Sequence, residues 1–282
     1  MLPLLKKSVE NWQKVDAPRL AAALTYYALF SIAPLLVLLI AIAGAVLGPQ
    51  AVEGQIVGQV EGWLGTAGAT AVESLLATVS LQGGSWMAVT LAILLTLYGA
   101  SNLFNQLKLT LNVVWHTPPV EEPGWLNFIK NRALALAMVF GSGILLVLLL
   151  SVSTAVTAID QYVSHLIPGL ADLVGLLRLT DLLLSILVST LLFAIVYKLL
   201  PDIRLAWRDV WIGAFVTAFL FTLGKLALGF YLGYASPGSA YGAAGSLVAL
   251  LVWIYYSLQF FLFGASFTAV YARERGSLSQ LQ

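Results

Sequence analysis

Six stretches of the chain are long and apolar enough to cross a membrane, and this feature restricts the fold more than any other. A helix rises about 1.5 Å per residue, so about 20 apolar residues cross a hydrocarbon core roughly 30 Å thick. The run from Ile144 to Leu150 lacks the alternation of membrane β-strands. The sequence therefore predicts an all-α polytopic membrane protein. The predicted transmembrane helices cover about 20–47, 86–114, 133–159, 181–200, 210–234 and 245–271.

The composition supports a membrane location and removes several classes of chemistry. Of the 282 residues, 60% are hydrophobic and 10% are charged, whereas a soluble domain carries about 25% charged residues. The absence of cysteine excludes disulfides, thiol catalysis and cysteine-bound metal. Because the formal net charge is only +1, we expect no nucleic-acid partner.

The basic residues predict the orientation in the membrane. Cytoplasmic loops carry an excess of Lys and Arg, and here basic residues gather at both termini and in the second and fourth loop regions. Both termini are therefore expected in the cytoplasm, which agrees with an even number of spans. The residues counted are Lys6, Lys7, Lys14, Arg19, Lys108, Lys130, Arg132, Lys198, Arg204, Arg208, Arg273 and Arg275.

Three segments lie outside the predicted spans and have their own patterns. Residues 1–19 predict an amphipathic helix in the headgroup plane, with a solvated charged leader as the alternative, and 272–282 predict a cytoplasmic tail. The acidic first external loop, 48–85, predicts two amphipathic helices that either cap a cavity or shield loop backbone. Their apolar positions are Val52, Ile56, Val60 and Leu64, then Val72, Leu75, Leu76 and Val79. A weaker stripe occupies the third loop, about 160–180.

The residues needed for enzymatic chemistry are scarce. His116 and His165 fall on opposite predicted sides of the membrane, so they cannot share a metal or a proton relay. No hydrolase, nucleotide-binding or metalloprotease motif is present in the sequence. We therefore predict a protein that is not an enzyme and that uses no cofactor and no metal.

Lys225 is the one charged residue deep inside a predicted span. A charged residue is costly in hydrocarbon, so its presence inside a span indicates a functional role as the first hypothesis. Thr217, Phe221, Lys225 and Gly229 follow at four-residue intervals on the fifth span. One interpretation is that the ammonium binds an anionic headgroup or carboxylate, and the other is a snorkelling or structurally paired lysine.

Polar residues also gather along other predicted spans. Asn102, Asn105 and Gln106 lie along one side of the second span, where buried amides either join helices or line a wet cavity. In the first span Tyr27 and Ser31 share a face with Pro34, which predicts a kink. Tyr256 and Gln259 form a thinner polar stripe in the sixth span. These residues are consistent with one central polar pocket that includes Lys225.

Several short segments together form a recognisable set of motifs: Ala21 to Pro34, Tyr98 to Trp115, Trp207, Gly213-Ala214, Gly224-Lys225, Tyr241-Gly242-Ala243, Trp253 to Tyr256 and Gly264-Ala265. With these motifs the chain resembles the YihY/BrkB family of bacterial inner-membrane proteins, once labelled as ribonucleases. The resemblance covers about 3–275 and implies six spans, cytoplasmic termini and a role in transport or lipid handling without a settled substrate. Many members carry Glu where this chain has Ser266, so a proton-coupling role for that glutamate does not transfer here.

The leading hypothesis is a multi-pass protein of the bacterial inner membrane that binds, and in one version transports, a small anionic or amphipathic molecule. The expected partners are membrane lipids and this ligand, and a homo-oligomer stays open. The alternatives are a scaffold that docks a partner through its external helices and, third, a membrane-bound nuclease. The residues proposed for the cavity are Lys225, Asn102, Asn105, Gln106, Tyr27, Ser31, Thr217, Tyr256 and Gln259.

Overall fold

The computed structural model describes residues 2–31, 86–117, 171–203, 205–235 and 245–278, with shorter pieces at 53–54, 56–58, 61, 69–70, 73, 133, 137 and 141. Within these residues all regular secondary structure is α-helical, as the sequence predicts. The helices are α1 (Leu2–Lys14), a helix over 17–31, α4 (Trp86–Trp115), α6 (Ala171–Leu199), α7 (Trp207–Ala235) and α9 (Gly245–Glu274).

Two described helical stretches are long and apolar enough to cross a membrane: Trp207–Ala227 in α7 and Leu247–Glu274 in α9. Both lie within the predicted fifth and sixth spans or extend them by a few residues. α4 coincides with the predicted second span to within one residue. The count of six spans and the cytoplasmic location of both termini stay predictions.

α6 begins ten residues before the predicted fourth span, so part of the predicted third loop is helical. The stripe that includes Leu173, Val174 and Leu177 continues with helical spacing into Leu183, and no proline interrupts it. Residues 171–180 therefore belong to α6 and not to a separate loop element. The other predicted loop helices lie largely outside the described residues, although Ile56 is helical and buried.

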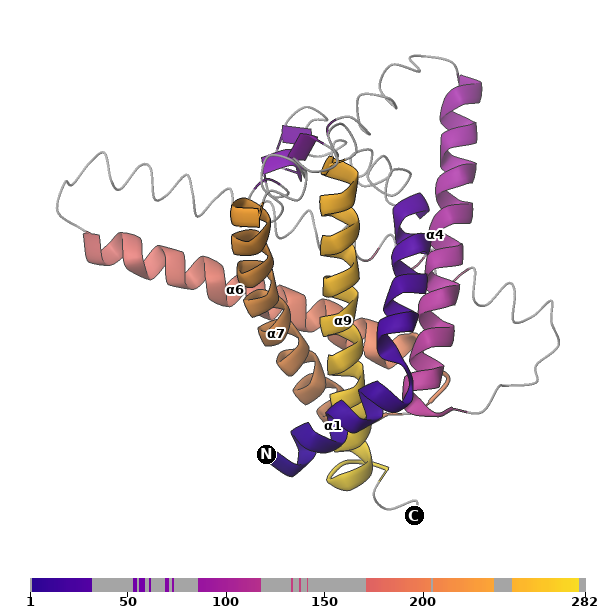
Figure 1. Cartoon of the computed structure of the whole chain (residues 1–282), viewed down its shortest axis with the longest axis vertical. Helices are drawn as coiled ribbons and strands as arrows, with labels where there is room; N and C mark the ends of the chain where they lie inside the picture. The colour runs from indigo at the N-terminus through magenta and orange to yellow at the C-terminus, as the bar shows by residue number, and fades with distance from the viewer. Residues whose placement is uncertain are drawn as a thin grey trace.

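α9 is the central helix of the described bundle. It packs most extensively against α7 on one side, and it also contacts α1 and α4. Figure 1 shows α7 and α4 on opposite sides of α9, with the helix over 17–31 beside α4 and α1 crossing the lower end of α9. Aromatic and aliphatic side chains from α4, α6 and α9 form the core at this end, among them Trp115, Tyr197 and Leu262.

α7 and α9 meet at a reciprocal contact between two glycines and two threonines. A Cβ placed on Gly213 of α7 would collide with Thr268 of α9, and one placed on Gly264 of α9 would collide with Thr217 of α7. Each threonine hydroxyl donates to the carbonyl of the glycine one turn earlier on its own helix, at 2.7 Å for Thr217 and 2.8 Å for Thr268. We call these four residues the Gly–Thr seam.

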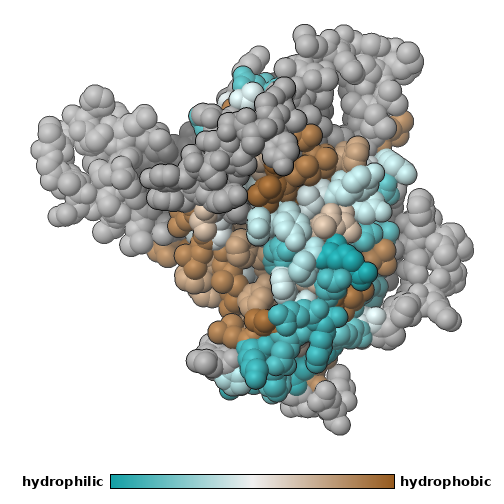
Figure 2. All heavy atoms as spheres, in the orientation of Figure 1, coloured by the Kyte–Doolittle hydropathy of each residue, from teal (hydrophilic) through white to brown (hydrophobic). Residues whose placement is uncertain are grey.

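The outward face of α7 is apolar. Phe215 and Phe219 are about half exposed, and Trp211, Leu223 and Leu226 continue the stripe at helical spacing. Such a face suits lipid hydrocarbon in a span of this kind. Figure 2 shows apolar surface over this side of the bundle and hydrophilic surface gathered lower down, over α1.

Two left-handed residues shape the lower end of the bundle. Asp16, with φ of 52°, turns the chain between α1 and the helix over 17–31. His116, also with φ of 52°, ends α4, where its N–H donates to the Val113 carbonyl and the Thr117 N–H donates to the Asn112 carbonyl. This pair of bonds is a Schellman motif with histidine where glycine is usual.

Candidate functional site

Lys225 lies on the packed side of α7, away from its apolar outward stripe. Along α7 it shares a sector with Thr217 and Phe221, whose side chains turn toward α6 and α9, and its own side chain is half-buried. The ammonium Nζ lies 5.6 Å from the centre of the Phe221 ring, within the range of a cation–π contact. Lys225 is therefore half-buried at the edge of the packed side of α7, with its ammonium over the Phe221 ring.

An aromatic cluster lies next to Lys225. The Phe221 ring meets Phe193 of α6 edge-on at 5.6 Å between ring centres, and Trp253 of α9 at 6.3 Å. Three helices thus contribute one aromatic ring each to this cluster, and Lys225 lies over the ring from α7. Aromatic rings can support a cation and also contact an acyl chain, so this arrangement fits the charged end of an amphipathic molecule.

Thr217 takes part in helix packing. Its side chain is fully buried in the Gly–Thr seam, and its hydroxyl lies 3.1 Å from the Tyr197 hydroxyl, which donates to the Phe261 carbonyl at 2.7 Å. These contacts satisfy the hydroxyl within the protein. Thr217 and Lys225 share a stripe, but the structure places them in different surroundings.

The amides belong to α4, which lies on the other side of α9 from α7, the helix of Lys225 (Figure 1). Asn102 and Gln106 are half-buried, and Asn105 is exposed on a face that also includes Tyr98 and Leu109. The side chains proposed for one cavity thus form two groups in the described residues.

Tyr27 and Ser31 belong to the group on the α4 side. The Ser31 hydroxyl lies 2.8 Å from both the Tyr27 carbonyl and the Gly99 carbonyl of α4, so it joins the first helix to α4. The Tyr27 ring is exposed and packs edge-on against Tyr26. Pro34, the predicted kink, lies outside the described residues.

On α9, the two residues of the predicted polar stripe differ in their exposure to solvent. Tyr256 is exposed, whereas Gln259 has a buried Oε1 without a hydrogen-bond partner among the described residues. The same holds for the buried hydroxyl of Ser266. Unsatisfied buried acceptors are uncommon in proteins, and Gln259 is the proposed site residue that shows this property.

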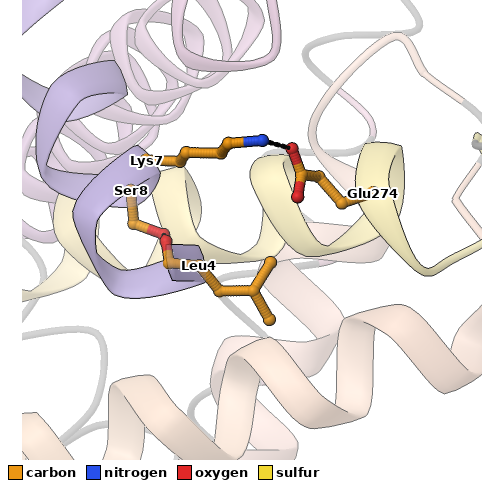
Figure 3. A network of polar contacts seen from close by, with 4 residues as sticks. All are labelled: Leu4, Lys7, Ser8 and Glu274. Atoms are coloured by element: carbon orange, nitrogen blue, oxygen red, sulfur yellow. Dashed lines mark hydrogen bonds and ion pairs between the residues drawn. The ribbon is translucent and has the colours of Figure 1, made fainter. Parts of the chain in front are cut away.

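The lower end of the bundle contains a polar network that the sequence did not reveal. Its members come from α1, α4, α7, α9 and the turns around them, so most partners are far apart in the sequence. Figure 3 shows one link, the ion pair between Lys7 of α1 and Glu274 of α9. We call the network the polar junction, and it comprises Lys7, Asn11, Lys108, Asn112, His116, Asp202, Asp209, Arg273, Glu274 and Ser277.

Three further sets of contacts belong to the polar junction. Asp202 accepts from Lys108 at 2.8 Å and from Asn112 at 2.9 Å, which fixes the turn after α6 to α4. Asp209 of α7, which is buried, accepts from the Ser277 N–H at 2.7 Å. A guanidinium nitrogen of Arg273 donates to the Trp115 carbonyl at 2.5 Å.

His116 connects α4 to α1 within this junction. Its Nε2 lies 2.9 Å from Oδ1 of Asn11, and the Asn11 amide nitrogen reaches the Val114 carbonyl at 3.4 Å. Partial burial lowers the pKa of His116, and the positive charges of Arg273 and Lys14 lower it further. In the neutral imidazole, Nε2 donates to Asn11.

These residues do not form a metal centre. Among the described residues, no three His, Cys, Asp or Glu side chains come together as metal ligands would. The polar junction distributes its carboxylates over separate partners, each an amine, an amide or a backbone N–H. Its geometry is that of a connector between helices.

Comparison with known proteins identifies the relatives of this chain. A UPF0761 membrane protein of Mannheimia succiniciproducens is 27% identical over 92% of this chain and 86% of its own length. Another, of Aggregatibacter aphrophilus, is 26% identical over 94% of this chain and 91% of its own length. No solved structure matches the chain. The model of the family described as virulence factor BrkB matches residues 8–282, which confirms the resemblance found in the sequence, and this chain is an integral membrane protein of that family.

Proposed function

We propose that the protein is a non-enzymatic transport or lipid-handling protein that binds an anionic amphipathic molecule beside Lys225. The observation that carries this proposal is the position of Lys225, a cation on the packed side of a membrane-spanning helix, next to an aromatic cluster from α6, α7 and α9. An ionisable side chain within a membrane-spanning helix is uncommon, and function is a common reason for its presence.

The depth of Lys225 suits the headgroup of a lipid. Counted from Trp207, where the apolar part of α7 begins, Lys225 is eighteen residues along the helix, or about 27 Å. A hydrocarbon core is roughly 30 Å thick, so the ammonium lies near the far boundary of the core. A ligand can place its anionic group there and lay its chains against the nearby apolar side chains.

Native mass spectrometry of the detergent-purified protein tests this proposal. We expect wild type to retain an anionic lipid or anion and Lys225→Met to lose it, because the ammonium supplies the attraction. Lys225→Arg, which keeps the charge, should retain the ligand. Leu226→Met is the matched control, since it introduces the same side chain at the adjacent, exposed position. Equal retention by Lys225→Met and wild type, with both proteins folded, overturns the proposal.

A second candidate function is a membrane scaffold that does not transport. The Gly–Thr seam and the bonded hydroxyl of Thr217 support it, because α7 and α9 are closely packed along the seam. The same experiment separates the two candidates. No retained ligand in wild type or in any variant favours the scaffold.

A further inference from the structure

α1 has two different faces. Leu4, Ser8, Asn11 and Val15 are buried against the bundle, and the Lys7–Glu274 ion pair and the Asn11–His116 bond fix this side in place. Figure 3 shows the ion pair together with Leu4 and Ser8. The opposite side of α1 is therefore held outward in a fixed orientation.

The outward face of α1 combines apolar and basic side chains. Leu5 is 43% exposed and Val9, one turn later, is 40% exposed. Lys6 is adjacent to Leu5, and Lys14 lies further along α1 on the other edge of this outward face; both side chains are exposed. A helix with exposed apolar residues flanked by lysines has the pattern of a helix that binds at a membrane interface.

The surrounding end of the bundle has more free cations than free carboxylates. Glu274, Asp202 and Asp16 are paired with Lys7, Lys108 and Arg19, and Asp209 accepts a backbone N–H. Among the described residues at this end of the bundle, four exposed basic side chains lie outside these ion pairs, against one such exposed carboxylate, Glu10. The four are Lys6, Lys14, Arg208 and Arg275.

Tryptophans place this end of the bundle at headgroup level. Trp207 is 49% exposed in the first turn of α7, where the apolar span begins, and Trp211 is exposed one turn later. Tryptophan is enriched at the boundary between hydrocarbon and headgroups. Ser277, just after α9, donates its N–H to Asp209 in that same first turn, and Lys7 pairs with Glu274 at the end of α9. α1 thus lies near the same level.

We infer that α1 and the first turn of α7 form a binding surface for the headgroups of anionic phospholipids. Lys6, Lys14 and Arg208 contact the phosphates, and Leu5 and Val9 enter the boundary between headgroups and acyl chains. This surface is separate from Lys225 and does not depend on the function proposed for it. Because most of its cations are exposed, binding here falls as salt rises.

The test compares lipid retention by the full-length protein in mixed micelles of phosphatidylglycerol and phosphatidylcholine, read by native mass spectrometry. The double variant Lys6→Gln, Lys14→Gln should lose preference for phosphatidylglycerol, by about fivefold for each charge removed. Glu10→Gln, on the same helix, should keep or strengthen the preference. Leu5→Gln with Val9→Gln should weaken retention of both lipids.

Two results would overturn the inference. One is an unchanged phosphatidylglycerol preference in the folded double lysine variant. The other is a preference that persists at about 1 M salt, where charges are screened within about 3 Å. Lys225→Met should leave this preference intact, so failure of the proposed function and failure of this inference are distinguishable.

Discussion

The Gly–Thr seam and the polar junction hold the same helices together by opposite means. In the seam, α7 and α9 approach so closely that a single added Cβ collides with a side chain of the partner helix. In the junction, long side chains and backbone groups reach between α1, α4, α7 and α9 through ion pairs and hydrogen bonds. The comparison suggests that shape fixes helix pairing inside the membrane, whereas charge fixes it at the boundary, where water is available.

The largest effect is expected when the seam is overfilled. Gly264→Leu places a large side chain where Thr217 already lies, which should lower the free energy of unfolding in mixed micelles by about 3 kcal/mol. Gly141→Leu is the matched control, because a Cβ at Gly141 meets nothing within 4 Å. If both variants unfold alike, the seam is less tightly packed than the structure indicates.

Removal of the buried carboxylate at the start of α7 should have the next largest effect. Asp209→Ala loses the bond from the Ser277 N–H and a negative charge at a helix N-terminus. We therefore expect the free energy of unfolding to fall by about 2 kcal/mol. Ser277→Ala keeps the N–H bond and loses only the hydroxyl that accepts from Ala206, and it should cost less. Chemical unfolding of both variants measures the difference, and an equal cost contradicts this assignment.

A smaller effect is expected at Asp202. Asp202→Ala removes the partner of Lys108 and Asn112, and because this carboxylate is partly exposed the cost should be about 1 kcal/mol. The cost should shrink as salt is raised, whereas the cost of Gly264→Leu should not change. Glu10→Ala, an exposed carboxylate on α1, should leave unfolding unchanged. If the loss of stability in Asp202→Ala does not change with salt, the contact does not act through its charge, which contradicts this prediction.

The smallest effect is the pH dependence from His116. Because the folded-state pKa of His116 is lowered, its neutral form contributes stability above pH about 6.5, the usual histidine pKa. That contribution is lost as the pH falls through the lowered pKa. Thermal unfolding of wild type should therefore lose more stability between neutral and acidic pH than His116→Asn, which also tolerates a left-handed backbone. Parallel pH profiles for the two proteins would argue against this role.

Much of the fold was accessible from the sequence, because hydrophobic length and period are local properties. The predicted limits of the second, fifth and sixth spans agree within a few residues with α4, α7 and α9. The family membership was also correctly identified, from short motifs spread over nearly the whole chain. The start of α6 was missed, since its apolar stripe was interpreted as a separate loop element.

The arrangement of the site was less accessible, because it depends on which helix faces meet. Thr217 and Lys225 share a stripe in the sequence, yet Thr217 is packed in the Gly–Thr seam, whereas Lys225 lies over the Phe221 ring. The polar junction was missed because its partners are far apart in sequence. The signal that could have indicated it was Asp209, an acid at the start of a predicted span, together with the Gly276-Ser277 turn near the C-terminus.

The ion pair between Lys7 and Glu274 has a consequence for the order in which the protein is made. Its two residues are 267 positions apart, while α7 and α9 are separated by only a short connection and can pair as a hairpin soon after both have left the ribosome. α1 is synthesised before α9, so it can bond to the end of α4 through Asn11 well before Glu274 is available. The ion pair therefore completes the docking of α1 only after α9 has been made.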